Sequence, residues 1–153
     1  MIEGCFDMGV VRRFMMRPEV YRYAAEFGVN EDQVEFSDGP RKIWLCYIQG
    51  KQVVGLIDMH VETGSMCIFH PYILREHKSN YDQMVQEFFT WFAEFMPKEA
   101  IKLNAYIPIV FKGAIMAAER AKMKREGLDR MSYRTADGVC DRILFGITRE
   151  ELG

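Results

Sequence analysis

The chain has 153 residues, of which 49% are hydrophobic and 27% charged, and its 20 basic and 22 acidic residues give a formal net charge of −2. This length predicts one domain over residues 1–153, large enough to bury a core. Near-neutral charge argues against a nucleic-acid partner, and the apolar runs are shorter than the roughly 18 residues of a membrane helix.

The first half of the sequence predicts a helix followed by strands. Residues 18–27 form a short helical stretch, because proline suits the first turn of a helix and Gly28 suits its C-terminal cap. Two runs rich in β-forming residues, KIWLCYIQ and QVVGLIDMHVE, meet at residues 49–51 and predict a hairpin. A third strand covers roughly residues 66–70.

The strongest helical pattern in the chain spans residues 81–96. Its apolar residues recur at three- and four-residue steps and form one broad face: Tyr81, Met84, Val85, Phe88, Phe92 and Phe95. Pro97 ends this helix. Residues 100–110 then alternate between apolar and polar types, as a strand does.

The last third predicts a helix and a hairpin. The helix runs from Lys112 to Glu126 with Gly127 as its cap, and two strands over residues 131–148 turn at Asp137-Gly138. The complete order predicts an α/β (α+β) fold: a mixed, mainly antiparallel central sheet with helices on both faces.

Polar residues alternate on the second predicted strand. Asp58, His60 and Glu62 share one face of it, and Glu62 or Asp58 is a candidate general base. The alternative is a polar face that simply meets water. The four cysteines are far apart and form no Cys-x-x-Cys pair, so we expect no metal site.

The order of elements resembles the GCN5-related N-acetyltransferase (GNAT) superfamily. Three stretches carry the resemblance: VVGLIDMHVETGSMCIFHPYILREH, AIKLNAYIP and DGVCDRILFGITREEL. It implies a GNAT-like domain that binds acetyl-CoA in a V-shaped gap between two splayed parallel strands, here about residues 66–71 and 101–106. The pyrophosphate would lie on backbone amides of the turn entering the helix at Tyr81.

That turn departs from the family pattern. Where the family has glycines, the chain reads Lys-Ser-Asn-Tyr-Asp-Gln over residues 78–83. Asp82 places a negative charge where a diphosphate would lie. Lys78 replaces the basic residue of the family, and Ser79 or Asn80 is expected to act as an ordinary N-cap of the helix.

Three further departures follow along the same binding surface. Phe111 stands where related enzymes carry a cofactor-binding Asn, and Ala118 stands where they carry a Tyr that acts as general acid. The glycine of the family motif after the helix is also absent, at residues 121–123. With the glycines of the cofactor loop, the binding Asn and the acid Tyr all missing, the sequence predicts a degenerate acetyl-CoA site and no bound cofactor.

Among GNAT-like proteins, the chain looks most similar to those of tailed bacteriophages. The resemblance lies in RPEVY (17–21), FHPYIL (69–74) and RILFGIT (142–148). It implies a non-catalytic head-assembly or internal virion protein whose partners are other proteins, including phage structural proteins. No secretory signal opens the chain, so we expect it in the host cytoplasm or incorporated into a virion.

The alternative function is an acetyl-CoA-dependent N-acetyltransferase that acetylates an amine. Glu62 would be its base, and Tyr106, or else Tyr72, its acid. The residues expected to hold the cofactor are Ile68, Phe69 and His70 through their backbone, and Lys78, Ser79 and Asn80 at the turn. A third possibility is a regulatory protein that binds an acyl-CoA without turnover.

Overall fold

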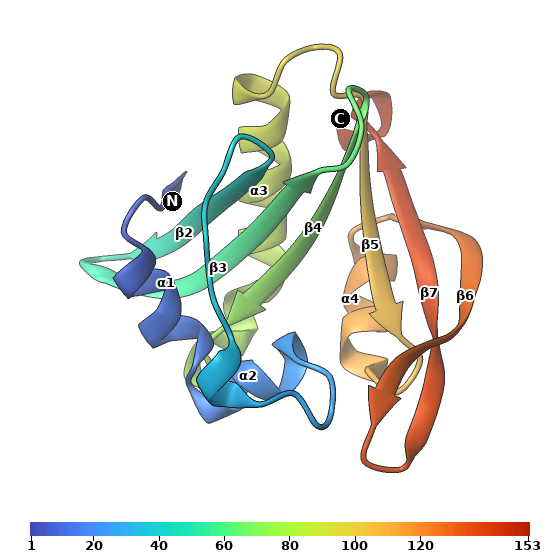
Figure 1. The fold of residues 1–153 in the computed structure, drawn as a ribbon. Coiled ribbons are helices and arrows are strands. Elements are labelled where there is room, and N and C mark those ends of the chain that lie inside the picture. The colour runs from blue at the N-terminus through green and yellow to red at the C-terminus, as the bar shows by residue number, and fades with distance from the viewer.

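The computed structural model describes residues 1–153, and its strands form one seven-stranded sheet in the order β1-β2-β3-β4-β5-β7-β6 (Figure 1). The strands are β1 (Ile2–Gly4), β2 (Lys42–Gln49), β3 (Gln52–Val61), β4 (Met66–Ile73), β5 (Lys102–Pro108), β6 (Lys124–Thr135) and β7 (Gly138–Thr148). The helices are α1 (Met8–Met15), α2 (Pro18–Ala24), α3 (Tyr81–Phe95) and α4 (Lys112–Arg120), with 3-10 segments η1 (Glu31–Gln33), η2 (Arg75–Asn80) and η3 (Arg149–Leu152).

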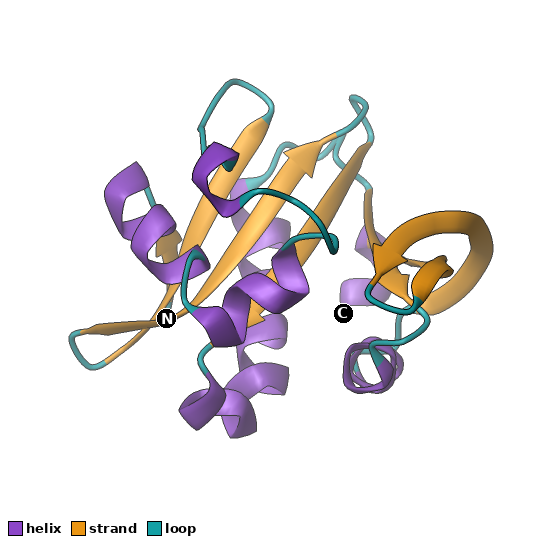
Figure 2. Cartoon of the chain, turned by 60° about the horizontal axis from the view of Figure 1, so that its bottom comes forward, coloured by secondary structure: helices purple, strands orange, loops and turns teal.

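Helices cover both faces of this sheet, α1 and α2 on one and α3 and α4 on the other (Figure 2). Alternation along β2 explains the two layers, because Leu45 and Tyr47 pack toward α3 while Trp44 and Cys46 pack toward α1. All neighbouring strands are antiparallel except β4 and β5. The predicted mixed, mainly antiparallel sheet is confirmed. None of the helices has the length and hydropathy that a membrane span requires.

Helix α3 lies close against the sheet because β3 carries a glycine beneath it. A Cβ atom at Gly55 would lie 2.5 Å from Met84 Sδ and 3.0 Å from the carbonyl oxygen of Tyr72. The other end of α3 is held by Arg149, whose guanidinium donates to the carbonyl oxygens of Ala93, Met96, Pro97 and Ala100 at 2.8–3.1 Å. These carbonyls lie in the last turn of α3 and in the segment after it, where a helix leaves carbonyl groups without intrahelical partners.

Strands β4 and β5 pair only at their first residues and then separate. Met66, Cys67 and Ile68 are in register with Lys102, Leu103 and Asn104, and no further pair follows. The two strands diverge from the top of Figure 1 downward. The splayed parallel strands implied by the GNAT resemblance are therefore present. Beyond the last pair, the facing edges of both strands have no partner in the sheet.

Several elements differ from the sequence-based expectations. Strand β1 was not predicted, α2 ends at Ala24 and not at residue 27, and β6 begins at Lys124 and not at residue 131. Helix α1 was not predicted; Asp7 caps it, accepting from the backbone N–H of Gly9 at 2.8 Å. Helix α4 ends at Arg120, not at Glu126, because Lys122 adopts a left-handed φ of 62°. The amide of the next residue then bonds back into the last turn, which closes the helix as a Schellman motif. Gly127, the predicted cap, lies in β6.

Candidate functional site

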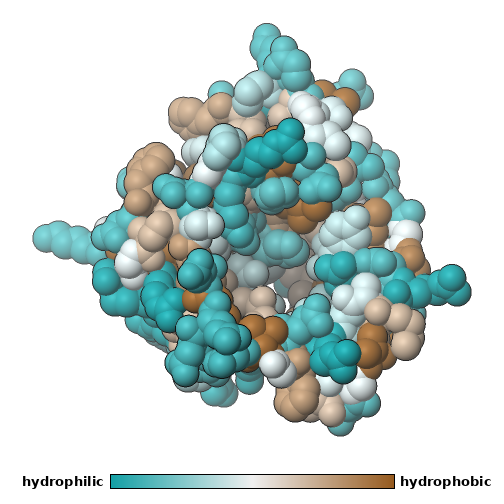
Figure 3. Space-filling view, in the orientation of Figure 1, coloured by the Kyte–Doolittle hydropathy of each residue, from teal (hydrophilic) through white to brown (hydrophobic).

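A cavity of about 820 Å³ fills the space between β4 and β5. Its wall is built by α2, the outer parts of β4 and β5, α4 and the β6–β7 hairpin. In the space-filling view, the face that carries α1 and α2 is hollowed near its centre (Figure 3). Small side chains on α4, at Ala114, Ala117 and Ala118, leave this space open. A volume of this size is typical of small-molecule sites.

Asp58 and His70 stand side by side on the wall nearest α1 and α2. They are register partners on β3 and β4, and both line the cavity. Lys42 Nζ donates to Asp58 Oδ2 at 3.1 Å, while the buried Oδ1 has no partner. Burial lowers the pKa of His70, an effect reinforced by Lys42 and Arg142 and opposed by Asp58. The imidazole is therefore neutral near pH 7 and able to accept a proton.

Two phenols line the cavity across the gap from each other. Arg142 on β7 places its guanidinium carbon 4.9 Å from the ring centroid of Tyr106, and Asp129 Oδ2 accepts from its Nη2 at 2.8 Å. This cation–π contact holds the Tyr106 ring at the cavity wall. Tyr72 is a poor proton donor, because burial and then the charge of Asp58 raise its pKa.

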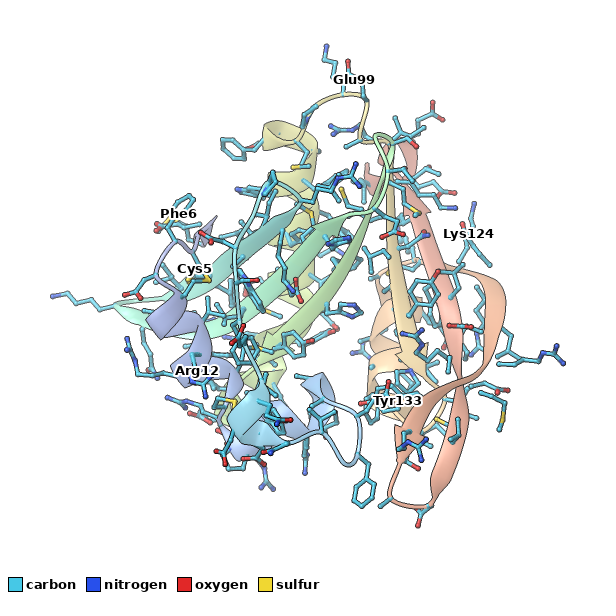
Figure 4. All side chains as sticks on the ribbon, viewed as in Figure 1. Cys5, Phe6, Arg12, Glu99, Lys124 and Tyr133 are labelled. Atoms are coloured by element: carbon cyan, nitrogen blue, oxygen red, sulfur yellow. The ribbon has the colours of Figure 1, made fainter.

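Aromatic side chains bridge the open end of the gap. Phe111, which precedes α4, makes edge-to-face contacts with Tyr23 of α2 and Tyr133 of β6, at centroid distances of 5.2 and 5.6 Å. The hydroxyl of Tyr133 (Figure 4) donates to the carbonyl oxygen of Ala25 at 3.1 Å. Phe111, where the resemblance implied a cofactor-binding Asn, thus packs across the gap.

The turn before α3 is a 3-10 helix and not an open loop. Within η2, the His77 amide donates to the Leu74 carbonyl at 3.0 Å, and the Tyr81 amide donates to the Lys78 carbonyl. Asn80 takes the N-cap position of α3, but neither its side chain nor that of Ser79 makes a capping hydrogen bond, contrary to expectation, because η2 runs straight into the helix. The Ser79 hydroxyl donates instead to Asn80 Oδ1 at 3.2 Å.

An ion pair joins α3 to α4 beside this turn. Arg120 Nε and Nη2 donate to the two carboxylate oxygens of Asp82 at 2.8 and 3.0 Å. The hydrogen bond from Arg120 lowers the pKa of Asp82, so this carboxylate stays charged at neutral pH. Arg120 and Lys78 both line the cavity.

The structure brings together some of the predicted site residues and leaves others apart. Those that line the cavity are Phe69, His70, Lys78 and Tyr106, together with Asp58 and Tyr72. Ile68 ends the paired part of β4, and Ser79 and Asn80 lie outside the cavity. Glu62 is also outside it, half exposed and 3.4 Å from His60 Nε2. The candidate base in the cavity is therefore Asp58 or His70.

Sequence reasoning missed three charged residues at this site. Lys42 and Arg142 reach it through strand register, and Arg120 through helix packing. A lone arginine opening the apolar run RILFGIT was the only signal for Arg142. Nothing in the sequence marked the other two: Lys42 opens the predicted strand KIWLCYIQ, and Arg120 lies within the predicted helix from Lys112 to Glu126.

Solved structures of N-acetyltransferases have the same fold. The spermidine N-acetyltransferase of Vibrio cholerae, in complex with CoA and spermine, has a TM-score of 0.79 at 10% identity over 99% of this chain and 96% of that chain. The ribosomal-protein-S18-alanine N-acetyltransferase of Escherichia coli has a TM-score of 0.73 at 11% identity, over 97% and 92%. No protein-family model and no curated protein matches the sequence. At these identities the likeness concerns the fold alone: the chain has the fold of the GNAT N-acetyltransferases.

Proposed function

We propose that the chain is an N-acetyltransferase that moves an acetyl group from a thioester in the β4–β5 gap to an amine. The observation that carries this proposal is the cavity between two unpaired strand edges, with Asp58, His70 and Tyr106 on its wall. A structural neighbour from V. cholerae binds CoA and spermine, which supports an acyl-CoA donor and an amine acceptor. The proposal departs from the sequence-based expectation that no cofactor binds.

The strand edges suit the donor's pantetheine arm. Beyond Ile68 and Asn104, the backbone N–H and C=O groups facing the gap have no ladder partner, and the amides of an extended arm would pair with them. The thioester supplies an activated acyl carbonyl: the amine nitrogen forms the new C–N bond, the C–S bond breaks, and sulfur leaves as the thiol.

The residues of the chain manage the protons of this reaction. Asp58 Oδ1, unpaired in the cavity wall, accepts a hydrogen bond from the amine and so orients it. His70, neutral near pH 7, takes the proton that the amine loses. Tyr106, beside Arg142, gives its proton to the departing sulfur and is reprotonated from solvent.

Thiol release from acetyl-CoA in the presence of a panel of primary amines tests the proposal. We expect His70→Gln to lower kcat/KM by roughly 100-fold or more, the range of a lost general base. Glu62→Gln is the matched control, because it changes a carboxylate outside the cavity. Loss of activity in Glu62→Gln but not in His70→Gln would assign the base to Glu62, and no thiol release with any amine would reject the enzyme.

The 3-10 turn η2 favours a second candidate function. Its engaged amides and the neighbouring Asp82 carboxylate suit a protein that kept the fold without the cofactor. That protein would be the non-catalytic interaction protein implied by the bacteriophage resemblance, acting in the host cytoplasm or in a virion with phage structural proteins. An unfolding midpoint unchanged by millimolar acetyl-CoA and by acetyl-pantetheine would favour it.

A further inference from the structure

We infer that the chain binds the acyl donor through its pantetheine arm, and that the diphosphate and nucleotide of CoA add little to the affinity of the donor for the chain. The substrate class is then acyl-pantetheine thioesters, whether on CoA, on a phosphopantetheine group of a carrier protein, or free. This inference rests on the proposed acetyltransferase function and narrows its donor. Two regions of the molecule support it: the η2 turn offers little to a diphosphate, and the cavity is open to the arm.

The first step concerns the donors available to a diphosphate. Open turns bind phosphate because consecutive backbone N–H groups lack internal partners. In η2, a 3-10 helix, these amides are used within the chain, as at His77 and Tyr81. Residues 78–83 contain no glycine, so side chains also surround the backbone there. A diphosphate at this turn would find few free donors.

The second step concerns charge. Asp82 follows the turn directly, and its carboxylate remains ionised because Arg120 hydrogen-bonds both of its oxygens. The same bidentate contact uses the Nε–Nη2 edge of Arg120 and neutralises its charge within the ion pair. Lys78 is the one basic side chain of residues 78–83. An incoming diphosphate therefore meets an ion pair whose charges cancel and one lysine, not a positive cradle.

The third step concerns the arm, for which the cavity remains open. The unpaired edges of β4 and β5 face each other across it, and neither receives a strand from elsewhere in the chain. Ala117 and Ala118 of α4 and Ala105 of β5 line it with short side chains. The part of the site that recognises an extended amide chain is thus present where the part that recognises a diphosphate is not.

Calorimetric titration of the full chain with S-acetyl-CoA, S-acetyl-4′-phosphopantetheine and S-acetyl-pantetheine tests the inference. We expect dissociation constants within tenfold of one another, since tenfold, about 1.4 kcal/mol, corresponds to roughly one good charge-assisted hydrogen bond. Binding of acetyl-CoA tenfold or more tighter than acetyl-pantetheine would overturn the inference and leave the proposed function standing. Absence of binding by all three would reject both.

An acetylated carrier protein, titrated in the same way, distinguishes the sources of the arm. Tighter binding of the carrier than of acetyl-phosphopantetheine would identify a protein-borne donor, and equal or weaker binding would identify a small thioester. Either result keeps the substrate class, because both present the same arm to the gap.

A variant tests the role of Asp82 separately. Asp82→Asn removes the charge from a side chain that is 55% exposed, so the fold should tolerate it. We expect acetyl-CoA to bind roughly fivefold more tightly, which is the effect of removing one screened charge at contact distance. The dissociation constant of acetyl-pantetheine should stay unchanged. Glu94→Gln, at the far end of α3, is the control. Equal changes for both ligands, or none for either, would contradict the electrostatic argument.

Discussion

Replacing Lys42 by methionine leaves Asp58 as an isolated carboxylate in the cavity wall. The Asp58 side chain is 16% exposed, and Lys42 Nζ, 3.1 Å from Oδ2, is its only hydrogen-bond partner. At an effective dielectric constant near 20 this contact corresponds to about 5 kcal/mol of Coulomb attraction, much of which is offset by desolvation of the two groups. The cost of an unpartnered buried polar group, about 1–3 kcal/mol, is the better measure of the loss.

We therefore expect Lys42→Met to lower the free energy of unfolding by about 2 kcal/mol, or the melting midpoint by roughly 4–8 °C for a chain of this size. Asp58→Asn should cost less, because Lys42 is 35% exposed and its ammonium can turn into water. The double variant should recover most of the loss, since it removes the stranded charge.

Urea denaturation of the four proteins at pH 7 measures this cycle, with Lys51→Met at the exposed β2–β3 turn as the control. A Lys42→Met variant within about 0.5 kcal/mol of the wild type, the usual range of exposed substitutions, would refute the reasoning. A double variant as unstable as Lys42→Met would refute it as well.

Three further perturbations test other contacts. Arg149→Ala strands carbonyls at the end of α3 and should cost about 2–3 kcal/mol in urea denaturation; stability equal to that of Arg13→Ala would contradict this. Gly55→Ala forces its Cβ against Met84 and should cost about 1–3 kcal/mol, with an unchanged melting midpoint as the opposing result. Because burial lowers the pKa of His70, the unfolded chain binds its proton first as the pH falls below about 6.5, so wild-type stability should decline there. Denaturation at pH 7.5 and 5.5 should show a smaller decline in His70→Gln, and an equal one would contradict the assignment.

Turn residues and apolar periodicity predicted the elements whose boundaries depend on residues close in sequence. The turn at residues 49–51 and the Asp137-Gly138 turn place both hairpins, and the apolar face of residues 81–96 defines α3. The end of α4 was missed because Lys122, not a glycine, takes the left-handed position. The first part of β6 was missed because it is an exposed edge strand that lacks the alternating apolar pattern of a half-buried one.

Residues of the candidate site could be predicted only where the alternating pattern of a single strand contains them. Asp58 and Tyr106 could be placed from alternation along their strands, and the splayed strands from the family resemblance. The contacts that set their chemistry, from Lys42 to Asp58 and from Arg142 to Tyr106, depend on register between strands distant in sequence. Glu62 shares the alternation of Asp58, but it lies beyond the end of β3, outside the cavity.

The central claim, that the β4–β5 gap holds an acyl thioester, is tested most directly by blocking the gap. Ala114 of α4 lines the cavity, whereas Met116 on the same helix is 57% exposed and does not line it. Calorimetric titration with S-acetyl-pantetheine should give one site in the wild type and in Met116→Trp, and no binding in Ala114→Trp. Binding by Ala114→Trp as tight as by the wild type, or no binding by the wild type, would contradict the account.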